Sequence, residues 1–340
     1  MHRKICLVQG NTLEEAKYFI KTKYGVSDEY ITHCKAHPIY GTGQGSGNSS
    51  TYWLFISSTL FDMYNSQAQG SVYESKNRSI QVTVKAIGFV DDVRTSINAF
   101  ENNSLSLEQL VRMATRDSQL WHDIITTSNQ TLELPKCGYH AIIFEFEPTG
   151  EPKLVENPDC RITLQNCLGL PFDSSKWKTT FATKYLGAHK APAHQHHQAL
   201  ALKRKCDDLC QVITCSHLTR SETQCFYWAI YQLSANYVLS MTYFSKNKLH
   251  KIQAQAHCTM VGRSGYCINT ASNILFSPKK YGGAKFFHLY DDQGYGQIKQ
   301  FIKLWRSPTT QAGQLLRVVI SWTQYCTGTS TPILQDVKTK

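Results

Sequence analysis

The sequence lacks long apolar runs. No stretch of its 340 residues approaches the roughly 18 consecutive apolar residues that a membrane-spanning helix needs. The first ten residues, MHRKICLVQG, contain no apolar core of the kind found in secretory signal peptides. We therefore expect an intracellular protein of the nucleus or cytoplasm that has no membrane partner and keeps its twelve cysteines reduced. The sequence implies no particular oligomeric state.

Acidic residues are also scarce relative to basic ones. The chain has 25 Asp and Glu against 36 Lys and Arg, which gives a formal net charge of +11 and a pI of about 9.0. A basic excess of this size favours an anionic partner, and nucleic acid is the first candidate. The runs Lys203-Arg204-Lys205 and Lys279-Lys280 are the segments that we expect to contact phosphates.

The spacing of apolar residues predicts an α+β chain. Residues 106 to 127 form the clearest helix, because Ser106 and Gln109 have capping-box spacing ahead of an apolar stripe. Further helices are expected at 12–25, 51–64 and, with interruptions, 196–247. Strands are expected at 80–86, just after Asp92, at 140–146, after the turn at 148–150, and at 161–165. Residues 277–297 read as loop, and the pattern after 313 suits either helix or strand.

Three pairs of adjacent aspartates stand in different contexts. Asp207-Asp208 follows a basic run in a helical pattern, which predicts a solvated face. Asp291-Asp292 lies among glycines, which predicts a turn. Only Asp91-Asp92 directly follows an apolar strand, in IGFVDDV. Since Asp tolerates tight reversals, we expect this pair at the tip of a hairpin, on a rigid frame that could hold a metal ion.

Several segments resemble motifs of reverse transcriptases, in that family's order. GQGSGNSS resembles the loop-helix motif, FVDD the aromatic-x-Asp-Asp box, LPK a later lysine-bearing motif, and YLG the segment that joins palm to thumb. YGGAKFFHLYDDQG resembles a region beyond the thumb in retrotransposon-encoded enzymes of the non-LTR type. The resemblance covers most of the chain and implies a partial polymerase palm at residues 1–188. A helical thumb and C-terminal extension would follow at residues 189–340.

The resemblance also implies roles for particular residues. It implies RNA-directed DNA synthesis with Mg²⁺ or Mn²⁺, an RNA template, a DNA primer and deoxynucleoside triphosphates. Two metal ions would stabilise the attacking and leaving oxygens in this chemistry. The implied site comprises the metal ligands and catalytic residues Asp91 and Asp92, the general acid Lys136, the nucleotide- and template-binding Gln44, Gly45 and Phe89, and the primer-positioning Tyr185, Leu186 and Gly187.

One part of the family pattern is missing from this sequence. A working enzyme carries a further metal-binding aspartate on a strand upstream of the Gly-rich loop, together with a fingers region. The acids before Gln44 are Glu14, Glu15, Asp28 and Glu29, and none matches that motif. We therefore expect a palm that lacks its first part and the fingers, and little or no polymerase activity from this chain alone. A nucleic-acid-binding remnant of a retroelement without catalysis is the alternative.

Zinc binding is a further alternative. HQHH at 194–197 precedes Cys206, Cys210, Cys215 and His217. This spacing has no tight C-x₂-C pair, so cysteines that fill a helical core are the favoured interpretation. No local signature supports a cysteine nucleophile.

Overall fold

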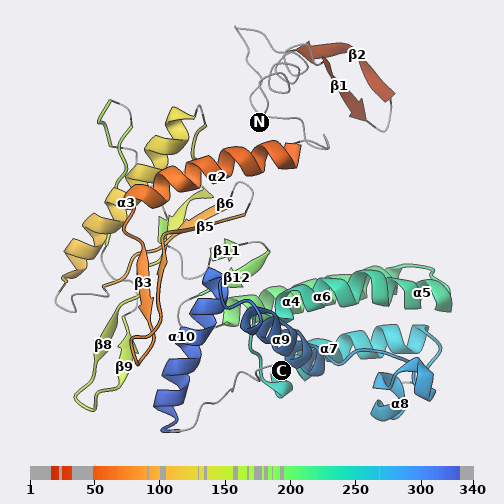
Figure 1. Ribbon diagram of the computed structural model, residues 1–340. Helices are drawn as coiled ribbons and strands as arrows, with labels where there is room; N and C mark the ends of the chain where they lie inside the picture. Colours follow the sequence, from red (N-terminus) through yellow and green to blue (C-terminus); the bar gives the residue numbers. More distant parts are fainter. Residues whose placement is uncertain are drawn as a thin grey trace, which may run out of the picture. The chain divides into compact units, whose positions relative to one another are not determined.

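The computed structural model describes residues 17–22, 25–32, 49–89, 92–99, 105–128, 130–133, 136–155, 160–166, 168–171, 178–179, 183–185, 187–191, 195–267 and 269–329 (Figure 1). It is a mixed α+β structure, as the sequence predicts. In this part of the chain no helix has the length and apolar character needed to cross a membrane.

Helices dominate the second half of the chain. The α-helices are α2 (Ser49–Gln67), α3 (Leu107–Thr127), α4 (His196–Cys215), α5 (Arg220–Phe226), α6 (Leu233–Leu239), α7 (Lys246–Ala256), α8 (Ser272–Phe276), α9 (Leu289–Trp305) and α10 (Gln311–Cys326). Two π-helical turns, η3 (Tyr227–Gln232) and η4 (His257–Val261), and the 3₁₀ turn η5 (Lys279–Tyr281) connect some of them. The helices predicted at 51–64, 106–127 and 196–247 are confirmed, and the segment after 313 is helical.

The strands pair two at a time. They are β1 (Lys17–Thr22), β2 (Gly25–Thr32), β3 (Ser71–Glu74), β4 (Gln81–Val84), β5 (Ala86–Phe89), β6 (Asp92–Thr95), β7 (Gly138–Tyr139), β8 (Phe144–Phe146), β9 (Pro152–Leu154), β10 (Lys178–Thr179), β11 (Thr183–Tyr185) and β12 (Ala188–Lys190). β7 and β10 pair in parallel, and the other described pairs are antiparallel hairpins. Because isolated hairpins are marginally stable in water, packing must support them.

The chain divides into two compact units, Met1–Met63 and Tyr64–Lys340. In the first unit, β1 and β2 form a hairpin in which Phe19 is paired with Tyr30, and their rings lie 5.7 Å apart. The helix predicted at 12–25 is therefore wrong over its described part. The aromatic and β-branched run YFI favours a strand, and Gly25, expected to stop a helix, begins β2 instead. The cap predicted at Thr12 and Glu15 lies outside the described residues.

In the second unit, α3 begins with the predicted capping box. The Ser106 side chain accepts a hydrogen bond from the Gln109 backbone N–H, and the Gln109 side chain accepts one from the Ser106 N–H. Trp121, Ile124 and Ile125 are buried, as the apolar stripe predicts.

A strand predicted at 161–165 is absent. Ile162 and Leu164 are buried while their neighbours are exposed, so buried and exposed side chains alternate as they would in a strand. However, the backbone of Gln165 bonds to a side chain instead of a strand: its N–H donates to Gln119 Oε1 at 2.8 Å, and its C=O accepts from Gln119 Nε2 at 3.0 Å. A single bridge between Gln165 and Pro171 is the nearest approach to sheet structure in this segment.

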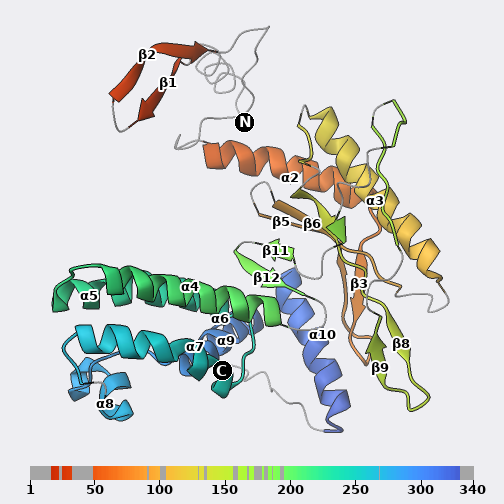
Figure 2. The same cartoon turned by 180° about the vertical axis from the view of Figure 1, so that it is seen from behind.

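Helix α10 packs against the β3–β4 hairpin, although more than 200 residues separate them (Figures 1 and 2). Val82, Val84 and Val318 form a small buried cluster. At the two ends of the contact, Trp322 Nε1 donates to the Glu74 C=O at 2.8 Å, and Gln311 Nε2 donates to the Thr83 C=O at 2.8 Å. The C-terminal helix therefore stabilises a hairpin that would be marginal alone.

The largest core lies among the helices from α4 to α9. At its centre Tyr227 and Tyr231 stack at 5.4 Å, and the Tyr227 ring meets Phe286 edge-on at 4.7 Å. Both tyrosines come from η3, where side chains four residues apart face the same core.

A segment without regular secondary structure, residues 283–288, runs through this core, and its backbone bonds to α8 through the N–H groups of Ala284 and Phe286. Gln253 Nε2 donates to the Phe287 C=O at 2.6 Å, and Gln253 Oε1 accepts from the Leu289 N–H at 3.0 Å. Gly283 is required here, since a Cβ would lie 2.1 Å from the Ser277 carbonyl oxygen.

The loop predicted at 277–297 extends only to His288, where α9 follows. Asp291 and Asp292 were expected in a turn, but they occupy the first turn of α9. Carboxylates are favoured at that position by the partial positive charge of the helix N-terminus. The glycines that suggested a turn, Gly294 and Gly296, lie inside the helix.

Candidate functional site

The FVDD segment forms the end of a hairpin. β5 and β6 are antiparallel, and the last pair of the ladder joins Phe89 to Asp92. This register leaves a two-residue connection, Val90 and Asp91, which lies outside the described residues. The predicted hairpin is thus present, and Asp92 is the first residue of its returning strand.

Phe89 and Asp92 share one face of this hairpin, because directly opposed residues of an antiparallel pair project to the same side. Both are exposed, and 57% of the Phe89 surface is open to solvent. The hairpin therefore presents a carboxylate and an aromatic ring together on an accessible surface.

The YLG segment belongs to a second, shorter hairpin with a connection of the same length. Tyr185 pairs with Ala188, so Leu186 and Gly187 make the connection, and Leu186 lies outside the described residues. Gly187 has φ +79°, the left-handed region that favours glycine. Directly after it Ala188 is buried against the helical core, and the His189 N–H donates to Gln198 Oε1 at 2.5 Å. This hairpin is therefore attached to α4, at the start of the helical region.

The remaining predicted residues are not brought together with these hairpins in the described part of the chain. Lys136 is exposed, and its backbone N–H closes a tight turn onto the Glu133 C=O at 2.8 Å. Its side chain makes no hydrogen bond or ion pair with Asp92 or any other described residue. Gln44 and Gly45 lie outside the described residues, although the helix expected after them is present as α2.

Asp92 fits a magnesium ion in its chemistry. An exposed carboxylate supplies the hard oxygen ligand that Mg²⁺ prefers and leaves positions for water or phosphate oxygens. Among the described residues, which exclude Asp91, no group of three or more His, Cys, Asp or Glu side chains gathers as a metal site would.

The cysteines considered as zinc ligands belong instead to the helical core. Cys206 and Cys210 are buried on α4, and burial raises the pKa of their thiols to about 11 and about 12. Thiolates are the metal-binding form, so these protonated side chains act as small apolar residues. Cys215 is exposed at the end of the same helix.

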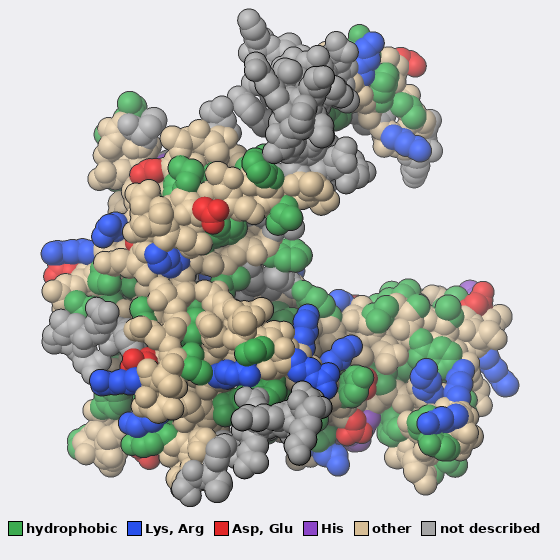
Figure 3. Space-filling view, in the orientation of Figure 1, with side chains coloured by type: hydrophobic (Ala, Val, Ile, Leu, Met, Phe, Trp, Pro, Cys, Tyr) green, Lys and Arg blue, Asp and Glu red, His purple; other side chains and the backbone are tan. Residues whose placement is uncertain are grey.

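Basic side chains are prominent on the helical region, which comprises helices α4 to α9. Figure 3 shows Lys and Arg spread over its visible face with few acids among them. Lys203 is bound to Asp207 at 2.5 Å on α4, and Arg204 and Lys205 beside it are exposed. Lys279 lies over the Trp228 ring, 4.1 Å from its centroid. The solvated face predicted at Asp207-Asp208 holds for Asp208, which is exposed, whereas Asp207 is half-buried.

Two kinds of residue were missed by sequence reasoning. Asp117 lies on the buried face of α3 between Ala114 and Trp121, and an acid inside an apolar stripe was the available signal. The second kind is a group of three exposed tyrosines around α9, namely Tyr243, Tyr290 and Tyr295. They share no helical periodicity in the sequence, because Tyr243 belongs to a loop.

No protein-family model matches this sequence, and no curated protein matches it. The resemblance to reverse transcriptases thus rests on the short motifs themselves.

Proposed function

We propose that this chain is a reverse-transcriptase palm and thumb that binds an RNA template paired to a DNA primer. The observation that carries the proposal is the β5–β6 hairpin, in which Phe89 pairs with Asp92. An aromatic-x-Asp-Asp segment needs this geometry to hold two carboxylates at the end of a rigid ladder.

Three further features support the proposal. The second hairpin, closed by the pair Tyr185 and Ala188, leads directly into a helical region, as a palm-to-thumb connection does. The exposed cations Arg204, Lys205 and Lys280 offer contacts to phosphates. The net charge of +11 favours a polyanion.

In this proposal the residues have separate tasks. Asp91 and Asp92 would hold Mg²⁺ or Mn²⁺, which supplies charge stabilisation for phosphoryl transfer when bound. Lys136 would donate a proton to the leaving group. Gln44, Gly45 and Phe89 would contact the nucleotide and template, and Tyr185, Leu186 and Gly187 would position the primer.

We further propose that the chain alone synthesises little or no DNA. Phosphoryl transfer depends on positioning and on charge stabilisation by a complete set of ligands. Of the family's metal-binding motifs, the sequence supplies the one that contains Asp91 and Asp92, and none of the acids before Gln44 matches the other. Binding of primer and template would persist, because phosphate contacts are distributed over many cations.

Two assays on the full chain test this proposal. Fluorescence anisotropy with a labelled RNA–DNA primer–template measures binding, and primer extension with Mg²⁺ or Mn²⁺ measures synthesis. We expect binding without robust extension. Asp91→Asn with Asp92→Asn should remove any ion-dependent binding, and Asp208→Asn on α4 is the matched control. Robust extension would contradict the proposed inactivity, and no binding would contradict the proposal as a whole.

The alternative is a nucleic-acid-binding remnant in which the aspartates have no role. The cation over Trp228 and the exposed basic face of α4 favour it, because they need no metal. In that case the variant with Asp91→Asn and Asp92→Asn would bind the RNA–DNA primer–template with the same affinity as the parent, with or without Mg²⁺. Charge reversal at Arg204 and Lys205 would weaken binding under either function.

A further inference from the structure

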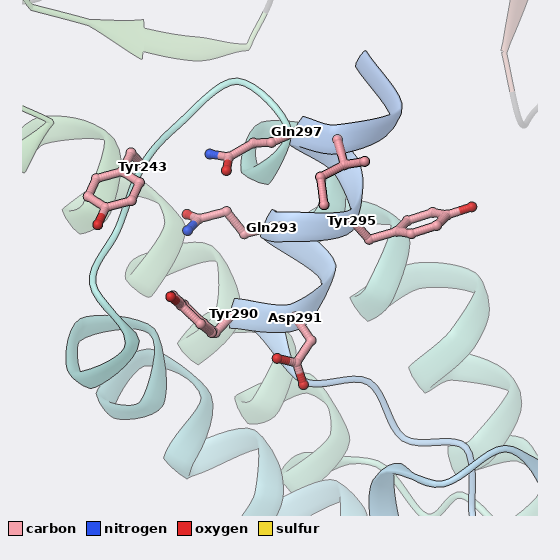
Figure 4. Close-up of a pocket in the computed structure, with 8 residues that line it drawn as sticks. Tyr243, Tyr290, Asp291, Gln293, Tyr295 and Gln297 are labelled. Carbon is pink, nitrogen blue, oxygen red and sulfur yellow. The ribbon is translucent and has the colours of Figure 1, made fainter. Parts of the chain in front are cut away.

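A cavity of about 390 Å³ opens over helix α9. Residues four apart on a helix lie above one another, so the α9 side chains around it form neighbouring rows. Figure 4 shows Tyr243 and Tyr290 to one side of α9 and Tyr295 to the other. The residues that matter for the argument are Tyr243, Tyr290, Asp291, Gly294, Tyr295 and Ile298.

The wall formed by Tyr243 is held in place by glutamine side chains. Buried Gln293 accepts from the Phe244 N–H at 2.9 Å and donates to the Phe244 C=O at 3.1 Å. Gln297 donates to the Thr242 C=O at 2.7 Å, and Gln195 accepts from the Tyr243 N–H at 2.7 Å. The backbone on both sides of Tyr243 is therefore fixed before any ligand arrives, which lowers the entropic cost of binding.

Gly294 forms the floor of the cavity. A Cβ on this residue would have nothing within 4 Å, whereas one on Gly296 would touch Ser240 Cβ at 3.0 Å. Close packing thus accounts for Gly296 but not for Gly294, although a glycine inside a helix is destabilising relative to alanine. Its effect here is a notch between Tyr290 and Ile298.

The charge of the cavity selects its ligand. Asp291 is the one charged side chain among the described residues that line it, and 77% of it is exposed although its Oδ2 lies 3.4 Å from His288 Nδ1. A carboxylate at the mouth repels phosphates and attracts cations. In the described part of the chain, the rings of Tyr243, Tyr290 and Tyr295 have no aromatic or cationic partner.

The same chain shows how such rings are used elsewhere. Lys76 lies 4.0 Å from the Tyr325 centroid, and Arg317 lies 4.3 Å from the Trp305 centroid. A cation over an aromatic face is attracted by the negative charge of the ring's face, and more strongly in desolvated positions. The cavity offers the same faces next to a carboxylate, without the cation.

We propose that this cavity binds the basic side chain of a protein segment, with arginine as the best fit. The guanidinium plane would stack between Tyr243 and Tyr290, which lie on the same side of α9 (Figure 4), and would pair with the Asp291 carboxylate. The aliphatic stem of the arginine would lie in the notch over Gly294. The partner is thus a peptide with an accessible arginine, bound at a surface that disfavours nucleic acid. This inference does not depend on the proposed palm-and-thumb function.

The test uses the full chain and a nine-residue Gly–Ser peptide with one central arginine and a trifluoroacetyl label, followed by ¹⁹F NMR. A peptide with citrulline in place of arginine has the same shape without the charge. We expect the citrulline peptide to bind at least about tenfold more weakly, since charge-assisted and cation–aromatic contacts are both lost. Asp291→Asn should weaken arginine-peptide binding by a similar factor.

Gly294→Leu should abolish binding by filling the notch, and it should fold normally because its Cβ meets no neighbour. Tyr281→Ala, at an exposed tyrosine outside the cavity, should leave the affinity unchanged. Equal binding of the arginine and citrulline peptides would overturn the proposal. It would equally be overturned if Asp291→Asn and Gly294→Leu retained the parent affinity, or if a single-stranded oligonucleotide displaced the peptide.

Discussion

The Asp117 carboxylate accepts a hydrogen bond from the backbone N–H of Gln69, with Oδ2 and N 3.0 Å apart. The same oxygen accepts a second bond from the Gly70 N–H at 3.3 Å, and only 2% of the Asp117 surface is exposed. One buried carboxylate of α3 therefore fixes the turn that links α2 to the β3–β4 hairpin. Its charge, together with burial, raises the pKa of neighbouring Tyr64 well above the usual range, with burial the larger cause.

Removing this carboxylate should destabilise the second unit. Asp117→Ala leaves the buried Gly70 N–H and the partly buried Gln69 N–H without an acceptor, so we expect a loss of about 2–4 kcal/mol in the free energy of unfolding, measured by urea denaturation. Asp117→Asn keeps one acceptor oxygen and should lose less. Glu108→Ala breaks only an exposed ion pair with Arg112 on the same helix and should cost less than about 1 kcal/mol. Equal losses for Asp117→Ala and Glu108→Ala would contradict this account.

Gln253 should be as important in the helical core. Gln253→Leu keeps the side-chain volume but leaves the Leu289 N–H buried without an acceptor, and the Phe287 C=O keeps only its longer bond from the Tyr227 hydroxyl at 3.4 Å. We expect a loss of about 2–4 kcal/mol in unfolding free energy. Gln255→Leu changes the same residue type on the same helix at an exposed position and should be close to neutral. If both variants unfolded at the same urea concentration, the buried amide would have no special role.

Two glycines should respond to alanine in opposite directions. Gly283→Ala places a Cβ against the Ser277 carbonyl oxygen and should cost about 2–4 kcal/mol, since that atom belongs to the backbone. Gly294→Ala meets no neighbour and should gain about 0.5–1 kcal/mol from helix propensity. Thermal unfolding followed by circular dichroism at 222 nm measures both. Stabilisation by Gly283→Ala would contradict the close approach of residue 283 to the Ser277 carbonyl oxygen.

Stability should fall in mild acid through His257. Burial, with the nearby His250 and His288, lowers the pKa of His257 from 6.5 to about 4. As the pH falls, the unfolded chain binds this proton before the folded chain does. The contribution of neutral His257 is therefore complete above pH 6.5 and is lost as the pH falls toward 4. Because solvent screens the partly exposed ring, we expect a loss of about 2 kcal/mol, less than the full shift in pKa would give.

Urea unfolding at several pH values isolates this effect. The difference between the parent and His257→Gln should shrink between pH 6.5 and 4, while exposed His217→Gln should follow the parent throughout. A pH dependence that is identical in the parent and His257→Gln would assign the acid sensitivity to other groups.

Local signals predicted several elements of the fold from the sequence. The capping box at Ser106 and Gln109 marks the start of α3, and the strand that runs into Asp91 and Asp92 predicts the β5–β6 hairpin. These succeed because both ends of the interaction lie within a few residues. The return strand β9 after the turn at 148–150 was predicted for the same reason.

The failures involve partners distant in the sequence. The segment 161–165 alternates as a strand does, but the Gln119 side chain takes the hydrogen bonds of Gln165. The run around Phe19 has helical spacing, and pairing with Tyr30 makes it a strand. Of the candidate site, the hairpin and Gly187 could be anticipated from turn residues. The tyrosine cavity could not, because the hydrogen bonds of Gln293 bring Tyr243 to α9 from another segment.

The most direct test of the central claim is the affinity of the full chain for an RNA–DNA primer–template as a function of salt. If cations of the helical region bind the phosphates, affinity should fall at least about tenfold between 50 and 200 mM KCl, because counterions are released on binding. Charge reversal at Arg204 and Lys205 should reduce the slope. An affinity that is independent of salt, or no binding at 50 mM KCl, would contradict the claim that this chain holds nucleic acid.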